Sequence, residues 1–371
     1  MSELSSVGQD KVPVETLGSK VSAPRVQVAA RGVPALWGAA AVAFLLGALM
    51  VGLGTGPIAI GWGAIAQSAL AHLPLLHVHS PLGAIDTAII WQIRAPRVAL
   101  GALVGGMLAV AGASYQGVFR NPLADPYLLG VAAGAGLGAT LAIAYSSAGG
   151  RASELLPAAA FVGAVCSVAA AYALGRSVAG GRTTATLILA GVTVAAFMTA
   201  VQTFVQQQHS QTLLQVYSWI LGGLSGASWH DFLLALPYVG VSAAILVAHR
   251  RVLDVLSLGD EEAASLGLHV RRVRLVIVGA ATCGTAAAVA VSGLIGFVGI
   301  IVPHAIRLAI SSSYRAIVPL SLLLGAGFLV LADVLARTVM SPAELPLGVV
   351  TAFFGAPFFA VVLRTSRRGG M

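Results

Sequence analysis

Residues that could carry out a reaction are scarce in this chain, and the patterns of the common reaction centres are missing from it. An intramembrane enzyme would need a nucleophile and a base on facing helices, or paired metal ligands such as H-E-x-x-H, and the sequence has neither. The two cysteines, Cys166 and Cys283, each lie in an apolar stretch, which favours small buried side chains over a disulfide or a metal site. There is no G-x-x-x-x-G-K-[ST] phosphate loop. We therefore expect no catalytic residue, no metal site and no cofactor bound by this chain.

The composition instead indicates lipid as the main solvent. Of 371 residues, 58% are apolar and 9% are charged, whereas a soluble domain carries roughly 25% charged residues. The 44 glycines are spread through apolar stretches without a three-residue period, which excludes collagen and suits membrane helices. The sequence predicts a polytopic membrane protein.

Apolar runs of the length that crosses a bilayer, about 17 to 25 residues, recur ten times. No run alternates in the pattern of an outer-membrane barrel, so we expect an all-α fold. Prolines near residues 122, 126 and 303 make some spans short or broken, which indicates a translocation path or, equally, kinks that serve packing. The predicted spans are 34–53, 97–117, 126–146, 154–174, 185–206, 232–249, 273–292, 294–311, 316–336 and 345–363.

Basic residues orient these spans. In a soluble protein the net charge of +8 could suggest binding of nucleic acid. Here the positions of the basic residues instead indicate which loops are cytoplasmic. With ten spans and both termini inside, seventeen of the 21 basic residues are cytoplasmic. An eleventh span in the ambiguous segment 56–82 would spoil that split. We predict a disordered cytoplasmic tail at 1–33, one membrane domain at 34–365 and a second cytoplasmic tail at 366–371.

The largest cytoplasmic loop, 253–272, predicts a short surface helix. Asp260 can cap it, Glu261 and Glu262 follow in the first turn, and Gly267 suits the position just past its end. A basic piece with Arg271 and Arg272 comes next. Such a compact helix could be held by another protein, although a plain connecting loop needs no partner.

Seven runs resemble the FecCD-type permeases of importers for vitamin B12, haem and ferric siderophores. They occur in the family's order and cover most of residues 88–365. The runs are WQIRAPR (91–97), QGVFRNPLADPYLLG (116–130), LILAGV (187–192), WILGGLSGASW (219–229), LSLGDEEAASLG (256–267), IGFVGIIVPHAIR (295–307) and ELPLGVVTAFFGAPFF (344–359).

The resemblance implies a homodimer that encloses one pathway, with two separate ATP-binding cassette ATPase subunits beneath it that bind ATP and Mg. The ATPases would hold the loop through a set of coupling residues. These are Gly259, Asp260, Glu261, Glu262, Ala263, Ala264, Gly267, Arg271 and Arg272.

The resemblance also implies docking of a periplasmic binding protein, whose glutamates would bind external arginines. Matching positions are Arg94, with Arg97 nearby, and Arg337; arginine suits the role because its planar fork grips carboxylates. Alternatively, Arg94 and Arg97 are anchors at the membrane interface, and Arg337 pairs with Asp333 on the same helix.

The cytoplasmic gate would lie at Asn121, Leu123 and Thr184 according to the same resemblance. Capping of the fifth span by Thr183 or Thr184 is an equal alternative.

Histidines need separate treatment, because imidazole is the usual ligand of haem iron. Solvated side chains are the simpler interpretation of the loop histidines, and contact with a passing haem is the alternative. An interhelical hydrogen bond is expected for His304. The other candidates are His72, His77, His79 and His209.

The expected function is ATP-driven import of haem across a bacterial inner membrane by alternating access. Gly293-Leu294 replaces the Gly-Pro common in the family, and Leu213, Leu214 and Gln215 stand where many relatives have an arginine; an uncharged path suits a flat, apolar ligand. Ferric siderophore or cobalamin is the alternative substrate. An ion-coupled secondary transporter is a distant alternative, since it would need more ionisable residues at mid-membrane.

Overall fold

The computed structural model describes residues 33–56, 58, 60–71, 81–146, 152–177 and 184–366. The chain divides into two units, Met1–Ala30 and Arg31–Met371, and all of these residues belong to the second. The predicted tail at 1–33 therefore lies almost wholly outside the described residues, as does most of the tail at 366–371.

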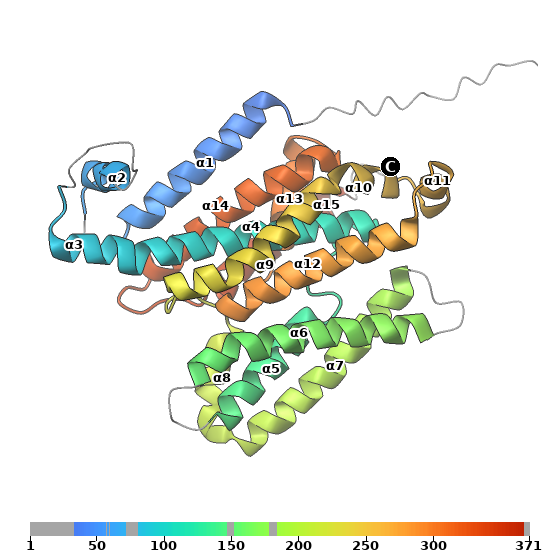
Figure 1. Ribbon diagram of the computed structural model, residues 1–371, viewed down its shortest axis with the longest axis horizontal. Helices are drawn as coiled ribbons and strands as arrows, with labels where there is room; N and C mark the ends of the chain where they lie inside the picture. Colours follow the sequence, from blue (N-terminus) through green and yellow to red (C-terminus); the bar gives the residue numbers. More distant parts are fainter. Residues whose placement is uncertain are drawn as a thin grey trace, which may run out of the picture. The chain divides into compact units, whose positions relative to one another are not determined.

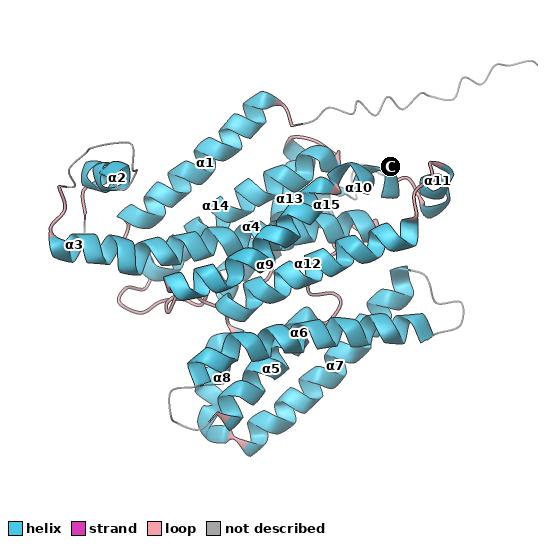
Figure 2. Cartoon of the chain, in the orientation of Figure 1, coloured by secondary structure: helices cyan, strands magenta, loops and turns pink. Residues whose placement is uncertain are grey.

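Throughout the described ranges the regular structure is helical, with no strand (Figure 2). The all-α class is thus confirmed. Figure 1 gives the arrangement of the elements. They are α1 (Ala35–Gly54), α2 (Trp62–Ala71), α3 (Ala84–Ala88), η1 (Ile89–Arg94), α4 (Ala95–Phe119), α5 (Val131–Tyr145), α6 (Ala152–Ser177), α7 (Thr184–Gln208), η2 (Ser210–Thr212), α8 (Leu213–Ile220), α9 (Trp229–Ala248), α10 (Arg250–Leu256), α11 (Asp260–Ser265), α12 (Val270–Ser292), α13 (Val298–Ala309), α14 (Tyr314–Thr338) and α15 (Leu347–Ser366).

Each predicted span coincides with an apolar helix. Within the described ranges, seven helices are long and apolar enough to cross a membrane, and three shorter ones at Val131–Tyr145, Val298–Ala309 and Leu347–Val362 fill the remaining predicted positions. The short helices follow the breaks at Pro122, Pro126 and the turn before Val298. The prediction of a polytopic helical membrane protein is confirmed.

The second span begins earlier than predicted. The apolar helix runs from Ala84 to Phe119 rather than from residue 97. Charged Arg94 and the following Pro96 resemble a boundary in the sequence, yet the chain passes them through a π-helical turn, Ile89–Arg94. The wider turn accommodates the proline at the start of α4, and backbone carbonyls accept hydrogen bonds from the Arg94 guanidinium.

Three short helices were not predicted as separate elements. Within the ambiguous segment 56–82, residues 62–71 form α2, and residues 72–80 lie outside the described ranges. Helix α8 follows α7 after a turn at His209, and α10 precedes the coupling loop. Each has fewer than eleven residues, so apolar runs of spanning length could not reveal them.

Helix α4 is the centre of the bundle. Almost all of its residues from Val104 to Phe119 are buried, and it packs against α14, α12, α13 and α9. Small residues allow this packing: a Cβ on Gly105 would meet the carbonyl of Gly325 on α14.

Helices α5, α6 and α7 form a second group that contacts the first mainly through α6 and α12 (Figure 1). Here too the backbones touch, since a Cβ on Gly134 of α5 would meet the carbonyl of Gly163 on α6. A Cβ on Gly138, one turn later, would meet the carbonyl of Ala159, so these small residues mark a crossing of α5 and α6.

Candidate functional site

The three arginines predicted to dock a binding protein are gathered near one end of α4 and α14, and all have partners inside the chain. Arg94 is 4% exposed. Its guanidinium donates to the carbonyl oxygens of Leu53 at 3.0 Å, Gly54 at 3.3 Å and Ile58 at 2.6 Å. Arg94 therefore fastens the end of α1, and the segment that follows it, to η1 just before α4.

Arg97 forms the centre of an ion-pair network. Its Nη2 lies 2.8 Å from Asp333 Oδ1 on α14, and its Nη1 lies 2.8 Å from Glu344 Oε1 in the loop before α15. Further bonds from Nε to Asp333 and from Nη2 to Glu344 make both contacts bidentate. The hydrogen bond from Arg97 holds the pKa of the Glu344 carboxyl below its usual range.

Arg337 completes this network. Its Nη2 donates to the carbonyl of Gly52 at 2.6 Å, and its Nε lies 3.6 Å from Asp333 Oδ2, one turn earlier on the same helix. The alternative pairing of Arg337 with Asp333 is therefore present. Docking by these arginines stays a prediction, and it would require them to exchange internal partners for those of another protein.

The coupling loop contains the predicted short helix, α11. The helix starts at Asp260 with Glu261 and Glu262 in its first turn, while Gly259, at φ 143°, is the cap. The expectation that Asp260 itself caps the helix is wrong by one residue, because its carboxylate instead accepts from Arg274 at 2.9 Å. Gly267, at φ 85°, ends the helix as predicted, and its N–H donates to Ala264.

One side of α11 packs against the rest of the chain, and the other side is exposed. Ala263 is buried against the protein, whereas Glu261, Glu262 and Ala264 are exposed. Arg271 and Arg272 are also exposed, at the start of α12. These residues could meet another protein without any rearrangement of α11.

Asp254 is an anchor of this loop that we did not predict. Its carboxylate accepts from Ser313 Oγ at 2.7 Å and from the backbone N–H of Tyr314 at 2.6 Å. Arg315 lies 3.4 Å away. The pattern of a capped N-terminus at Ser313 is visible in the sequence, but the partner from α10 is not. Through Asp254, α10 and the coupling loop are fixed to the start of α14.

The predicted gate residues lie on two segments. Asn121 Oδ1 accepts from the N–H of Leu123 at 2.9 Å in a tight turn after α4, and the side chain of Leu123 is exposed. Thr184 is the first residue of α7. Thr183 and the side chain of Thr184 lie outside the described residues, so the capping alternative does too.

Two further residues hold the gate turn, and both were missed. Asp125 Oδ1 accepts from the N–H of Tyr127 at 2.7 Å, and burial raises the pKa of Asp125 to about 6. The hydroxyl of Tyr127 donates to the carbonyl of Ile295 at 3.0 Å and lies 3.1 Å from the N–H of the same residue. The turn is thereby joined to the loop before α13.

A polar stripe without charge runs over the exposed side of the last turns of α7 and continues through η2 into α8. From Thr184 to Ile220 the chain has no Asp, Glu, Lys or Arg. Hydroxyls and amides recur at four-residue spacing on the exposed side, and Phe197 and Phe204 flank them at 65% and 64% exposure. The stripe residues are Thr199, Thr203, Gln207, Gln211 and Gln215.

The histidine predictions have different outcomes. His304 is buried, and within the described part of the chain neither ring nitrogen has a hydrogen-bond partner, so the expected interhelical bond is wrong. Its ring instead packs edge-on against Phe358, at 5.9 Å between centroids. His209 turns back onto α7, with Nδ1 3.2 Å from the carbonyl of Val205. The candidates at residues 72, 77 and 79 lie outside the described residues.

Comparison with known proteins identifies the family of this bundle. Residues 43–365 match the FecCD transport family. The chain belongs to that family. The membership and the apolar helices together make it a multi-pass membrane permease, and the family resemblance predicted from the seven sequence runs is confirmed.

Curated relatives carry different chelates. The chain is 39% identical over 358 residues to the cobalamin import system permease protein BtuC of Halobacterium salinarum, covering 88% of this chain and 95% of that protein. It is 40% identical over 284 residues to the hemin transport system permease protein HmuU of Yersinia pestis, covering 75% and 84%. The iron(3+)-hydroxamate import system permease protein FhuB of Bacillus subtilis is 38% identical over 283 residues, with 76% and 72% covered.

A solved structure has the same fold. It is described as an inward-facing conformation of a metal-chelate type ABC transporter, and it superposes with a TM-score of 0.78 at 26% identity, covering 90% of this chain and 99% of that one.

Proposed function

We propose that this permease imports a metal chelate across a bacterial inner membrane, driven by ATP hydrolysis on a partner, and that haem is its substrate. The observation that carries the proposal is the uncharged polar stripe on α7 and α8. The Thr203 hydroxyl donates to the carbonyl of Thr199 within α7, so the exposed amides of Gln207 and Gln215 carry the argument. Amides that face outward from a membrane helix suit an aqueous path better than lipid. Aromatic side chains beside them offer flat apolar contact to a large ring.

The chemistry of the stripe favours weak, sliding contact. A path must bind its cargo loosely enough to release it, and charged side chains would hold the metal or the carboxylates of a chelate. Threonine and glutamine give hydrogen bonds of modest strength. A haem could therefore pass without ligation by this wall.

Cobalamin is the second candidate substrate and ferric siderophore the third. Two of the relatives above are named for cobalamin and for hemin at nearly equal identity, and both cargoes are metal-centred rings. The uncharged stripe accommodates either, and the siderophore relative keeps the iron-chelate alternative.

The homodimer is proposed from strongly exposed apolar side chains on α8 and α15. Phe353 on α15 is 75% exposed and Leu214 on α8 is 85% exposed. Two copies that face each other through α7, α8 and α15 would enclose one pathway, and the gate at Asn121, Leu123 and Thr184 would close its cytoplasmic end.

Energy would enter through α11. We propose that two ATPase subunits hold its exposed face, and that closure of the ATPase pair moves the helix. The movement would reach the gate through Asp260, because its carboxylate lies 3.6 Å from Arg120, the residue before Asn121. Alternating access then follows, with both termini in the cytoplasm. The periplasmic binding protein would dock at the other side, near Arg94, Arg97 and Arg337.

The test is the ATPase rate of the reconstituted complex. The cognate binding protein is offered with haem, with cobalamin, with a ferric siderophore, or empty. Stimulation by the haem-loaded protein above the other three supports the haem assignment. Stimulation by cobalamin or siderophore alone replaces the substrate and keeps the importer, and equal rates in all four arms contradict the proposal.

A further inference from the structure

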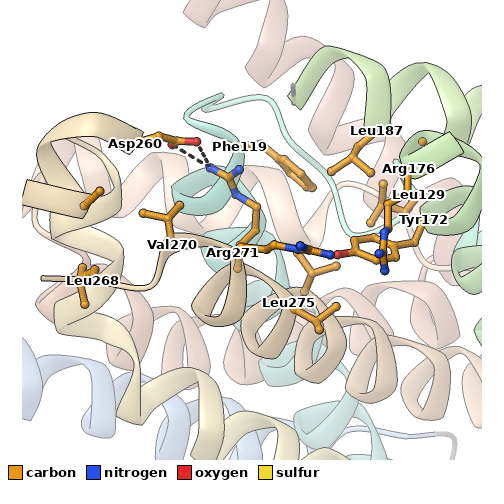
Figure 3. A pocket seen from close by; sticks show the side chains of 14 residues that line it. Phe119, Leu129, Tyr172, Arg176, Leu187, Asp260, Leu268, Val270, Arg271 and Leu275 are labelled. Carbon is orange, nitrogen blue, oxygen red and sulfur yellow. Dashed lines mark hydrogen bonds and ion pairs between the residues drawn. The ribbon is translucent and has the colours of Figure 1, made fainter. Parts of the chain in front are cut away.

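A basic cavity lies beside the coupling helix and is separate from the residues of the polar stripe. Two of its lining residues, Leu129 and Leu187, come from the two segments that carry the predicted gate residues. The cavity has a volume of about 320 Å³ and is formed by the ends of α4, α6, α7, α11 and α12 (Figure 3). Three arginines, Arg176, Arg271 and Arg274, line it. Apolar side chains from α7 and α12, Leu187 and Leu275 among them, form an apolar wall beside the arginines.

The cavity has an excess of positive charge. Asp260 is the single carboxylate among its lining residues, and Arg274 already pairs with it at 2.9 Å. Arg274 Nε is buried without a hydrogen-bond partner in the described structure. Within the same residues neither Arg176 nor Arg271 has a carboxylate within salt-bridge distance, and both are exposed, so their guanidinium groups are open to an anionic ligand.

Arg176 and Arg271 both lie near the ring of Tyr172, so a single ligand could contact both. Figure 3 shows Arg271 extending across the cavity toward Tyr172. The guanidinium carbon of Arg176 lies over the same ring, 5.8 Å from its centroid. Stacking on an aromatic ring pre-orders an arginine whose donors remain free.

We propose that this cavity binds the phosphate of an anionic phospholipid headgroup. Guanidinium groups recognise phosphate oxygens through paired hydrogen bonds. The volume lies at the low end of ligand pockets, roughly 300–1,000 Å³, which suits a headgroup rather than a whole lipid. The apolar wall belongs to α7 and α12, helices long enough to cross the membrane, so acyl chains can continue along them.

A lipid is favoured over free phosphate because the cavity combines charge with that apolar wall. The coupling helix is on the side where basic residues concentrate, and the anionic cytoplasmic leaflet supplies such headgroups at high local concentration. The bound headgroup would join α6 to α12 through Arg176 on α6 and Arg271 on α12. The inference does not depend on which chelate is transported.

The experiment measures lipid retention by the purified full chain in neutral detergent, without ATPase or substrate. Phosphatidylglycerol, phosphatidylcholine and inorganic phosphate are titrated separately and counted by native mass spectrometry. We expect the wild type to retain phosphatidylglycerol in preference to phosphatidylcholine, and inorganic phosphate not to displace it. The double variant Arg176→Gln/Arg271→Gln should bind about thirtyfold more weakly.

Two controls separate the site from general charge and from misfolding. Arg250→Gln/Arg251→Gln removes equal charge from the same side without touching the cavity and should retain the lipid. Leu275→Glu keeps all three arginines, changes an exposed side chain and should also lose it.

Several outcomes would overturn the inference. These are equal loss in the two double variants, full displacement by inorganic phosphate, and equal retention of phosphatidylcholine. The inference is also overturned if the wild type retains no phosphatidylglycerol.

Discussion

At the scale of single residues, the outer ion-pair network decides how α4 and α14 are joined. Arg97 and Asp333 are 11% and 3% exposed in their side chains. The family resemblance predicted a docking role for the arginines at positions 94, 97 and 337, which are three of the four basic residues that the predicted topology places outside. It could not supply their partners, since the contact between Arg97 and Asp333 joins positions far apart in the chain.

Removing Arg97 should therefore destabilise the fold. We expect Arg97→Met to lower the free energy of unfolding by about 3–5 kcal/mol, because it leaves the Asp333 carboxylate buried without its main partner. Arg97→Lys keeps the charge but loses the bidentate hydrogen bonds, so its free energy of unfolding should lie between those of the wild type and Arg97→Met. Chemical unfolding in detergent measures both variants, and a wild-type value for Arg97→Met would contradict the role of the network.

The pH dependence of the same network follows from Glu344. Arg97 holds the pKa of Glu344 below its ordinary value near 4.5, so as pH falls the unfolded chain takes up this proton first. The stabilisation is present above about pH 4.5 and is lost as pH falls through the lowered value.

Wild type and Glu344→Gln should thus differ in unfolding midpoint at neutral pH and converge in acid. Thermal unfolding followed across pH in one detergent measures this. A difference that grows as the pH falls would have the wrong sign for a carboxylate stabilised by Arg97.

At the scale of elements, the apolar runs were enough to place the helices of spanning length. They could not place the start of the second span, because a π turn carries the helix past Arg94 and Pro96. Nor could they find α8, which continues the polar stripe after the turn at His209. The predicted coupling helix was correct to one residue, since acidic residues and Gly267 mark its ends.

The crossing of α4 and α13 gives a test at this scale. A Cβ on Gly112 would meet the backbone of Gly299, including its carbonyl oxygen. Gly112→Ala should therefore push the helices apart and lower the free energy of unfolding by about 1–3 kcal/mol. Gly279→Ala on α12 is the matched control, because nothing lies within 4 Å of the added Cβ. Equal stability of the two variants would contradict the close contact.

At the scale of the whole molecule, the proposed transport functions are divided between two groups of helices. The group around α4 carries the outer arginines and holds α11, and the group of α5, α6 and α7 presents the polar stripe. Contacts between α6 and α12 join the groups. The sequence indicated the class of protein through its family runs, but the stripe became visible only once α7 and α8 showed which sides are exposed.

The most direct measurement is uptake into proteoliposomes that contain this chain and its ATPase, with haem offered on the cognate binding protein. We predict accumulation that requires ATP and stops when the ATPase is omitted or cannot hydrolyse ATP. Accumulation that proceeds without ATP, or that follows an imposed proton or sodium gradient, would contradict the account and place the chain among ion-coupled transporters.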